Sequence, residues 1–395
     1  MSESIVNKPK LVVMLSRFPF PLEKGDKLRA YQFIKGLSDD YSIHLICTTD
    51  EIVSTESKKE LEKYCTEIHI FKLTKLGLFF LLMTALFFKK TFQVHYFYRS
   101  SINKSIQGLL EKIKPDHIFC QLIRVSEYVK HYHHCKKTLD YMDVLSVGMK
   151  RRVSVEKWYK RWFFKLEFER VRSYERSIFD YFENKLIISD QDQNLIPHPR
   201  NSEIKIVSNG ISDLFFEELE VEKEFDLVFV GNLSYAPNVE AAEFLANEIL
   251  PELHRRGFKL NVLISGASPD KRVLKLESEY VKISGWVEDI RLSYLKGRLF
   301  VAPLFIGTGQ QNKVLEAMAL GVPCLTSSLV FRGLNQFSTQ NILLADTFDT
   351  FVEKIISVSN NFEYLHVLST NAKKEIKENY KWTTQISALK SILRS

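Results

Sequence analysis

The chain has few cysteines, and they do not form a structural framework. Five are spread over the sequence, at positions 47, 65, 120, 135 and 324. The number is odd and no two have the spacing of metal ligands, so neither a disulfide-stapled domain nor a zinc finger is expected. Three histidines, His131, His133 and His134, lie beside Cys135. Ligands this close in sequence cannot easily converge on one ion, so a solvated helix end or loop is the simpler interpretation.

Long apolar runs and a dinucleotide fingerprint are also missing. The most apolar stretch, residues 76–88, has thirteen residues without a charge, whereas a membrane-spanning helix needs about twenty. Lysines flank this run on both sides, so it predicts either a buried helix or a helix that lies in the lipid headgroup region. No G-x-G-x-x-G follows the first predicted strand, which argues against a nicotinamide dinucleotide site. The polar first ten residues carry no secretory signal, so we expect a cytoplasmic location.

What the chain does have is length, and apolar runs that alternate with helical spacing. Its 395 residues are enough for two domains. A strand, a loop with Gly25-Asp26 as its turn, a helix and a second strand open the chain, which predicts an α/β protein with doubly wound parallel sheets. These first strands are predicted at 10–15 and 41–47, with the helix at 28–37. Further strands are predicted at 117–121, 185–189, 204–207, 223–230, 260–265, 281–284, 299–302, 324–326 and 342–345.

Residues 301–328 carry the most informative pattern. A short apolar run leads into a loop with Gly307 and Gly309, and a helix predicted over 310–320 ends at Gly321. A strand–loop–helix unit of this kind presents free backbone N–H groups at the helix N-terminus, which suits a phosphate.

Two charged residues on that helix fit the same interpretation. Lys313 adds a positive charge near the phosphate, and Glu316 lies on the same flank of the helix. A carboxylate in this position can accept hydrogen bonds from ribose hydroxyls. The alternative is an ordinary α/β crossover with a solvated Lys–Glu pair.

Three segments together resemble glycosyltransferases of family 4 with the GT-B fold, especially those of bacterial exopolysaccharide clusters. Residues 307–323 (GTGQQNKVLEAMALGVP) resemble a variant of the donor-site signature. Residues 229–238 (FVGNLSYAPN) resemble the strand and loop that open the donor domain, and residues 17–30 (RFPFPLEKGDKLRA) resemble the N-terminal loop. The three segments occur in the order of that family and span most of the chain.

The resemblance implies a fold and a domain plan. It implies two Rossmann-like doubly wound domains that face each other across a cleft. Residues 1–210 would form the acceptor-side domain and residues 211–378 the nucleotide-sugar donor domain. Residues 379–395 would form a C-terminal helix that packs back on the first domain.

The resemblance also implies the site residues. Lys313 would neutralise the leaving diphosphate and Glu316 would hold the ribose, with Asp143 as the catalytic residue on the acceptor side. The expected donor-binding residues are Gly25, Asp26, Gly231, Asn232, Gly285, Trp286, Val287, Gly307, Thr308, Gly309, Gln310, Lys313 and Glu316. Neither a metal nor a cofactor is expected, because GT-B enzymes generally work without a bound metal.

The chain departs from the family pattern at four positions. Thr308 stands where the first glutamate of the usual Glu-x7-Glu pair meets the donor sugar, so the identity of the sugar cannot be carried over. Asn232 and Asn238 lie in the stretch where many relatives carry an arginine and a lysine for the phosphates, and Gln311 stands where the variant often has arginine. Fewer positive charges make Lys313 more important, or require help from the first domain. The candidates for that help are Lys24, Lys27 and Arg29.

Two interpretations stay open at other positions. The segment with Trp286 resembles the family segment whose backbone holds the nucleotide base, but Trp286 could equally be a core aromatic residue. Asp140 and Asp143 follow a strand-like pair where relatives carry an acidic or His-Asp pair near the acceptor. The alternative is a strand-end turn in which aspartate caps backbone N–H groups.

The net charge of +7 is concentrated in residues 150–176, which hold ten lysines and arginines against four glutamates, with interleaved aromatic residues. A nucleic-acid surface, an anionic membrane surface and an anionic sugar-lipid phosphate all fit this composition. A long helix with an aromatic core face and a solvated basic face accounts for it as well. We expect no nucleic acid as a partner, and a peripheral contact with the inner face of the cytoplasmic membrane.

Taken together, these features predict a retaining glycosyltransferase that moves a sugar from a nucleotide-sugar to a lipid-linked or polysaccharide precursor. One alternative is a GT-B nucleotide-sugar epimerase, which would need acid/base residues that face the sugar, and no such signature is apparent. The other is a nucleotide-binding subunit with weak or no activity, which Thr308 and the missing arginine favour slightly.

Overall fold

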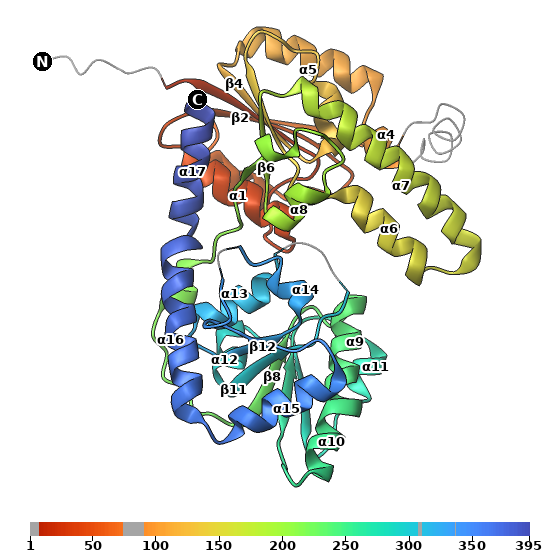
Figure 1. Ribbon diagram of the computed structural model, residues 1–395. Helices are drawn as coiled ribbons and strands as arrows, with labels where there is room; N and C mark the ends of the chain where they lie inside the picture. Colours follow the sequence, from red (N-terminus) through yellow and green to blue (C-terminus); the bar gives the residue numbers. More distant parts are fainter. Residues whose placement is uncertain (1–7, 74–90, 307–309, 336) are drawn as a thin grey trace, which may run out of the picture. The chain divides into compact units, whose positions relative to one another are not determined.

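The computed structural model describes residues 8–73, 91–306, 310–335 and 337–395. The chain divides into two compact units (Figure 1). The first unit is Met1–Val207 together with Ile386–Ser395, and the second is Ser208–Gln385. The apolar run at 76–88 lies outside the described residues.

The first unit is built on a seven-stranded sheet in the order β3-β2-β1-β4-β5-β6-β7, in which all neighbouring strands are parallel. The strands are β1 (Lys10–Leu15), β2 (Ser42–Thr49), β3 (Glu67–Lys72), β4 (His117–Gln121), β5 (Lys136–Asp140), β6 (Asn184–Ile187) and β7 (Lys205–Ile206). Apart from Lys10, the central strand β1 is apolar and fully buried, as expected of a strand covered on both faces. β3 lies at the edge and is only half-buried.

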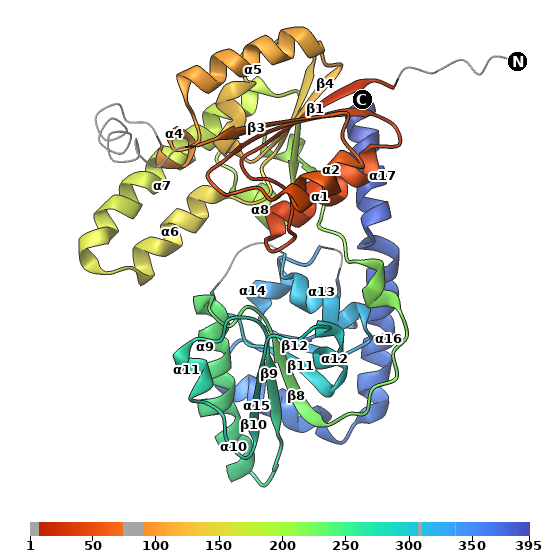
Figure 2. The ribbon, with the colours of Figure 1, turned by 180° about the vertical axis from the view of Figure 1, so that it is seen from behind.

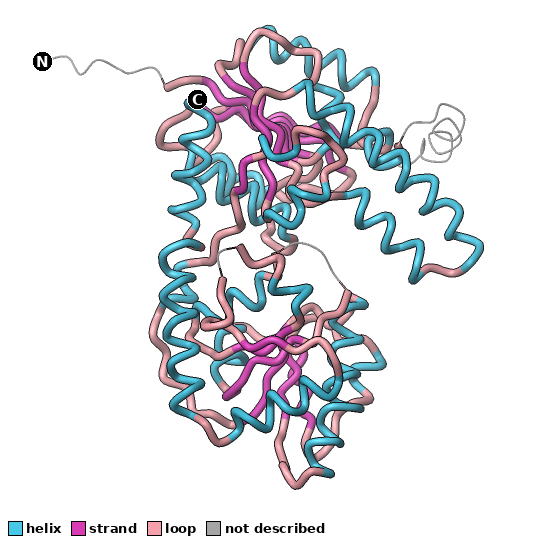
Figure 3. Tube along the Cα trace, in the orientation of Figure 1, coloured by secondary structure: helices cyan, strands magenta, loops and turns pink. Residues whose placement is uncertain are grey.

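Helices cover both faces of this sheet (Figure 3). They are α1 (Gly25–Leu37), α2 (Thr55–Glu62), α4 (Phe92–His95), α5 (Ser100–Ile113), η2 (Ile123–Tyr128), α6 (Leu145–Val155), α7 (Trp158–Ile178), η3 (Phe179–Tyr181), α8 (Asp190–Leu195) and η4 (Asn201–Glu203). The expected Gly25-Asp26 turn is wrong, because these residues form the first turn of α1. None of the helices described for the chain is both long enough and apolar enough to cross a bilayer.

The second unit repeats the same plan with six parallel strands in the order β10-β9-β8-β11-β12-β13. The strands are β8 (Phe225–Val230), β9 (Val262–Ser265), β10 (Val281–Gly285), β11 (Gly297–Ala302), β12 (Cys324–Thr326) and β13 (Leu343–Leu344). The helical segments are η5 (Asp213–Phe216), α9 (Ala236–Phe244), η6 (Leu245–Ile249), α10 (Leu250–Arg255), α11 (Lys271–Leu274), α12 (Ile290–Leu295), α13 (Asn312–Ala319), α14 (Ser328–Phe331), α15 (Phe348–Ser359) and α16 (Phe362–Asn379). Both sheets are therefore Rossmann-like and doubly wound, as the sequence predicts.

The last helix, α17 (Trp382–Arg394), joins the first unit for most of its length (Figure 2). Ile386 packs against Gly36 of α1 so closely that a Cβ on that glycine would lie 2.3 Å from the isoleucine side chain. Lys390 and Arg394 pair with Asp40, at 2.5 and 3.2 Å between nitrogen and carboxylate oxygen. The chain thus starts and ends in the same unit.

Candidate functional site

Each of the two sheets has its own topological switch point, which is the place where ligands bind in open α/β sheets. In the second unit, β8 and β11 are neighbours and the chain continues from them toward opposite edges of the sheet. Their carboxyl ends lead to Gly231-Asn232 and to the loop that precedes α13. Two of the expected donor-binding residues, Gly231 and Asn232, therefore follow directly after a strand of the switch point.

Glycine backbones approach one another closely at this edge. Gly231 follows β8 and its N–H donates to the carbonyl of Ser265 at 3.0 Å. Gly266 follows β9 with φ near +145°, and a Cβ there would lie 1.7 Å from the carbonyl oxygen of Gly231. A Cβ on Gly231 would itself meet the amide of Asn238 at 2.8 Å and Nζ of Lys313 at 3.3 Å. Side chains at either glycine would therefore disrupt the packing at this edge.

Lys313 reaches this edge from the first turn of α13. Its ammonium group donates to Oδ1 of Asn238, whose Nδ2 donates to the carbonyl of Asn232 at 2.8 Å. Nζ also lies 5.5 Å from the centre of the Phe229 ring. Burial lowers the pKa of Lys313 to about 8, although Glu316 opposes this shift. Among the described residues its hydrogen-bond partner is thus a neutral amide, and the charge that acts on its pKa is that of Glu316.

Glu316 lies one turn further along α13, and one oxygen of its carboxylate accepts a hydrogen bond. The hydroxyl of Tyr294, from α12, donates to Oε2 at 2.8 Å. Tyr294 is fully buried in the core of the unit. Burial raises the pKa of Glu316, while the Tyr294 hydrogen bond and the Lys313 charge act in the opposite direction. Among the described residues Oε1 has no hydrogen-bond partner, so it can accept from a ligand.

The structure describes some of the other donor-binding residues that the sequence predicts in the second unit. Gln310 makes two hydrogen bonds to the backbone of Asn209. Oε1 of Gln310 accepts from the N–H of Asn209 at 3.0 Å, and Nε2 of Gln310 donates to the carbonyl of Asn209 at 2.9 Å. Trp286 is 73% exposed, so the interpretation of it as a core aromatic residue is wrong. It follows Gly285, whose φ is +62°, at the end of β10. Val287 lines a hollow of about 570 Å³ beside α12. Gly307, Thr308 and Gly309 lie outside the described residues.

The switch point of the first unit lies between β1 and β4 and carries a different set of groups. Arg17, after β1, pairs with Asp26 in the first turn of α1 at 2.6 Å. Nε2 of Gln121, at the end of β4, donates to the backbone carbonyl of Asp26 at 3.2 Å. Arg124 follows on η2 and donates to Oε1 of Gln93 at 3.1 Å. Burial, and to a lesser extent the charge of Arg17, lowers the pKa of Arg124.

Strained backbone positions occur at the ends of β4 and β5. Leu122 and Met142 have φ of +66° and +63°, in a region of backbone conformation that residues other than glycine rarely adopt. Both pack with Ile188 in one small apolar cluster. Asp143 follows directly after Met142, and burial together with the charge of Asp192 raises its pKa to about 6. Strain of this kind clusters at functional sites, which marks Asp143 as a candidate on physical grounds.

Asp140 and Arg29 belong to the core instead. Both side chains are fully buried and pair through two hydrogen bonds, from Nε at 2.7 Å and from Nη2 at 3.2 Å. Oδ1 of Asp140 also accepts from the backbone N–H of Met142 at 3.2 Å. The strand-end capping alternative is thus confirmed for Asp140, and Arg29 is unavailable for a diphosphate. Lys24 and Lys27 both pair with Glu51, at 2.9 and 2.7 Å.

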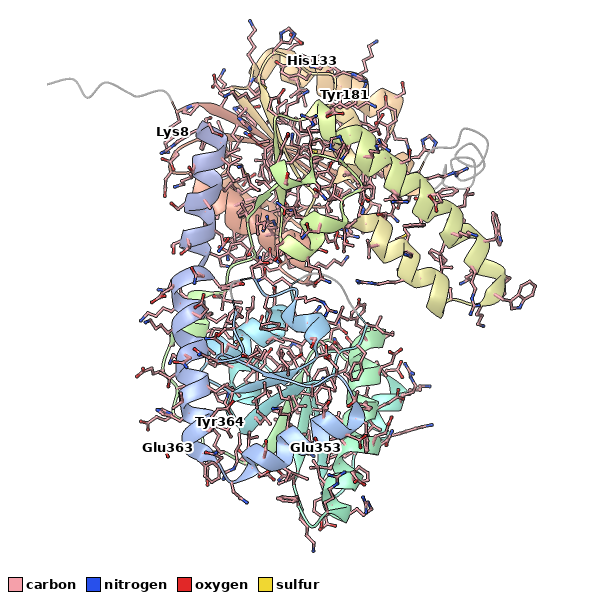
Figure 4. The ribbon with its side chains drawn as sticks, in the orientation of Figure 1. Lys8, His133, Tyr181, Glu353, Glu363 and Tyr364 are labelled. Carbon is pink, nitrogen blue, oxygen red and sulfur yellow. The ribbon has the colours of Figure 1, made fainter. Side chains whose placement is uncertain are left out.

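The described residues contain no group of three or more histidine, cysteine or acidic side chains that could hold a metal ion. His131, His133 and His134 are exposed at the surface of the first unit, where Figure 4 labels His133. All five cysteines are free, and Cys47, Cys120 and Cys324 are buried.

Sequence reasoning missed two residues. Tyr294 sits in an apolar helix and is typical of a core residue, so only the tertiary structure shows its hydroxyl on Glu316. Arg124 lies near Arg17, Asp26 and Asp143, as their effects on its pKa show. Its position just after a predicted strand was the one signal that could have found it.

Comparisons with known proteins agree with this architecture. Residues 224–361 match the family model described as glycosyl transferases group 1, so the candidate crevice of the second unit lies inside the matched region. An uncharacterized 44.6 kDa protein in the cps region of Klebsiella pneumoniae is 22% identical over 407 residues, which cover 94% of this chain and 96% of that protein.

Solved structures show the fold. Sucrose-phosphate synthase from Thermosynechococcus elongatus superimposes with a TM-score of 0.69 at 12% identity, and 98% of each chain is covered. HepE from Anabaena, solved in complex with UDP, gives 0.67 at 13% identity over 98% of this chain and 99% of that one. WaaG, a glycosyltransferase involved in lipopolysaccharide biosynthesis, gives 0.63 at 12% identity over 97% and 99%. These matches confirm the expected GT-B fold.

Proposed function

We propose that this protein, a GT-B chain that carries a glycosyl transferases group 1 domain, is a retaining glycosyltransferase of the family 4 type. It moves a sugar from a nucleotide-sugar donor to a lipid-linked or polysaccharide precursor. One observation carries the proposal. At the switch point of the second unit, the part of the chain that the structure describes gives Lys313 a neutral hydrogen-bond partner and leaves one carboxylate oxygen of Glu316 without a donor.

The donor binds through its nucleoside diphosphate. Oε1 of Glu316 accepts from a ribose hydroxyl, and Tyr294 holds the carboxylate through Oε2. Lys313 neutralises the diphosphate, helped by the backbone N–H groups at the start of α13. Gly231 lets the phosphates approach the strand end, since a Cβ there would meet Lys313.

Catalysis follows from where charge develops. As the glycosidic bond to the diphosphate breaks, negative charge builds up on the leaving phosphate, and a pre-placed ammonium group stabilises that state most. Lys313 is fixed by Asn238 before the donor arrives, so little reorganisation is needed. Asn232 and Asn238, which replace basic residues of many relatives, leave this task to Lys313 within the described crevice. No covalent enzyme residue and no metal is assigned.

The acceptor binds to the first unit. With a pKa of about 6, Asp143 is ionised at neutral pH and can accept a hydrogen bond or a proton from an acceptor hydroxyl. Arg124 lies near it and suits an anionic group on the acceptor, such as a phosphate or an acidic sugar. Gly25 and Asp26 remain predictions for the sugar-phosphate of the donor.

Three further details are proposals drawn from the comparisons and from chemistry. HepE has been solved with UDP-glucose, so UDP-sugars are the first donors to test. The relative from a cps region suggests a role in building a surface polysaccharide. The buried free thiols suit a reducing compartment such as the cytoplasm.

A second candidate is a nucleotide-binding subunit without transferase activity. Thr308 in place of the expected glutamate, and the asparagines at positions 232 and 238, favour it. This candidate predicts that nucleotide binding is retained and that no donor is turned over.

The test combines binding with turnover. Calorimetry with nucleoside diphosphates establishes which base binds, and a coupled assay then measures release of the matching diphosphate from a panel of sugar donors with lipid extracts as acceptors. Acceptor-dependent release supports the transferase. Binding without release from any donor supports the second candidate, and the absence of binding contradicts both.

A further inference from the structure

The first two turns of α7 expose three large aromatic side chains. Trp158 is 81% exposed, Tyr159 49% and Trp162 60%. Tryptophan is usually largely buried, so two such side chains one turn apart are unusual on a solvated surface. Because residues four apart lie on the same side of a helix, Trp158 and Trp162 form one patch.

Other residues of α7 form the face that packs in the core. Phe164, Val171 and Ile178 are buried at intervals of seven, which marks the face that packs on the first unit. Phe163 packs against Phe92 with ring centres 4.9 Å apart. The expectation of an aromatic core face is therefore met only by Phe163 and Phe164, and the three exposed aromatic residues do not contribute to the core.

Positive charge surrounds this patch. Residues 150–165 contain seven lysines and arginines and a single acidic residue, Glu156. Glu156 pairs only loosely with Lys160, at 3.9 Å. Lys157, Arg161 and Lys165 are exposed, and none has a carboxylate within 4.0 Å in the part of the chain that the structure describes.

The patch lies at the end of a projecting pair of helices. α6 and α7 run side by side, and both views show their junction at the end that points away from the seven-stranded sheet (Figures 1 and 2). The junction is Glu156-Lys157, directly before Trp158. We call residues 157–165 the hairpin tip.

We propose that the hairpin tip docks the protein on a membrane surface rich in anionic lipid. Tryptophan and tyrosine favour the interface between headgroups and acyl chains, where the ring is buried and the N–H or O–H stays hydrated. Lysines and arginines around them are attracted by the negative surface potential of anionic headgroups. Attachment through three rings and a few charges is peripheral and reversible.

The arrangement favours lipid over nucleic acid. Proteins that bind single strands combine a basic groove with aromatic platforms along its length. Here the aromatic and basic groups gather at one helix end, beside a turn, which suits insertion into a planar surface. Docking is independent of sugar transfer, because it needs neither donor nor acceptor, so its test and the transferase assay fail separately.

Vesicle co-sedimentation tests the proposal on the full chain. The parent protein should bind phosphatidylcholine vesicles that contain about 30% phosphatidylglycerol, and binding should fall as NaCl rises from about 0.05 to 0.5 M. Vesicles of phosphatidylcholine alone should bind at least about tenfold more weakly.

Paired variants separate the tip from general effects. Trp158→Ser/Trp162→Ser should weaken binding by about tenfold or more, whereas Phe362→Ser/Tyr364→Ser, an exposed aromatic pair on α16, should not (Figure 4 labels Tyr364). Lys157→Glu/Lys160→Glu/Arg161→Glu should abolish the salt-sensitive binding. The triple reversal Lys271→Glu/Arg272→Glu/Lys275→Glu changes net charge equally and should leave most of it.

Tryptophan fluorescence gives a second readout. On anionic vesicles with brominated acyl chains, emission of the parent should be quenched and shifted to the blue, and Trp158→Phe/Trp162→Phe should lose most of the change. No vesicle binding at low salt would overturn the proposal. So would tip variants that bind as the parent does, or tip-dependent binding of an oligonucleotide in place of vesicles.

Discussion

The two units share one topology and use it differently. Each sheet has the strand order of a Rossmann-like domain, with its first and fourth strands in contact at the switch point. In the second unit, the strand ends carry closely packed glycines, a lysine held by an amide and a glutamate with one free oxygen. In the first unit, they carry ion pairs and strained non-glycine residues.

The difference is one of charge compensation. Arg17 and Arg29 each have a carboxylate partner within the first unit, at 2.6 and 2.7 Å. Among the residues that the structure describes, the hydrogen-bond partner of Lys313 is the neutral amide of Asn238, and burial lowers the pKa of the lysine. Two arginines of the first unit are thus neutralised, whereas Arg124 donates to the neutral amide of Gln93 and keeps its charge for the acceptor anion proposed above. Topology gives each sheet a switch point, and the side chains beside it differ in the charge that they offer to a ligand.

The largest effect should follow from breaking the compensated pair. Arg29→Ala leaves Asp140 buried and unpaired, which should lower the free energy of unfolding by about 3–5 kcal/mol. Urea denaturation followed by circular dichroism measures this loss. Lys63→Ala removes an exposed partner of Glu60 and serves as the control, with little change expected. A parent-like midpoint for Arg29→Ala would show that the pair is not needed for stability.

Removing the positive charge of Lys313 should lower the rate of turnover. Lys313→Met should lower kcat by about 10²–10³-fold, the range for losing one group that stabilises developing negative charge. Nucleotide affinity should change less, because the contact strengthens as the bond breaks. Lys271→Met, on the surface of α11, is the matched control and should keep parental turnover. Equal losses in kcat for both variants would remove Lys313 from the site.

Tyr294→Phe tests the proposed ribose contact of Glu316 in the second unit. It removes one hydrogen bond to Glu316 without changing the shape of the core. We expect nucleotide affinity to fall by about 1 kcal/mol, roughly fivefold in Kd. A double-mutant cycle with Glu316→Gln, measured by calorimetry, should show that the two effects are not additive. Additive losses would mean that Tyr294 acts through stability alone.

The pKa of Lys313 predicts a pH dependence for binding. The free protein has a pKa of about 8 at this group, and a bound diphosphate raises it, so the protonated form binds better. Affinity should therefore be constant below pH 8 and fall as the pH rises above it, with proton uptake on binding. Lys313→Met should remove this dependence. Titrations in buffers of different ionisation enthalpy measure the uptake, and a pH-independent Kd for the parent would contradict the assignment.

The sequence predicted the buried frame well, because fully covered parallel strands are continuous apolar runs. β1, β4 and β12 have the predicted bounds. β3 escaped prediction because it is an edge strand whose residues alternate between apolar and polar. Gly25 was interpreted as a turn although it begins α1.

The candidate site was predictable only where its residues are close in sequence. Lys313 and Glu316 lie on one helix turn, so local spacing brings them together. Arg29 and Asp140 are 111 positions apart, and only folding pairs them. The same holds for Tyr294 on Glu316. Local patterns report helices and strands, whereas contacts between distant segments depend on the packed core.

Nucleotide titration of two variants tests the central claim most directly. Calorimetry with the nucleoside diphosphate that the parent binds should show that Glu316→Ala weakens affinity by about 1–3 kcal/mol. Asp143→Asn, in the loop that follows β5 in the first unit, should bind that nucleotide as the parent does. Parental affinity in Glu316→Ala together with a loss in Asp143→Asn would place the nucleotide in the first unit and contradict the account.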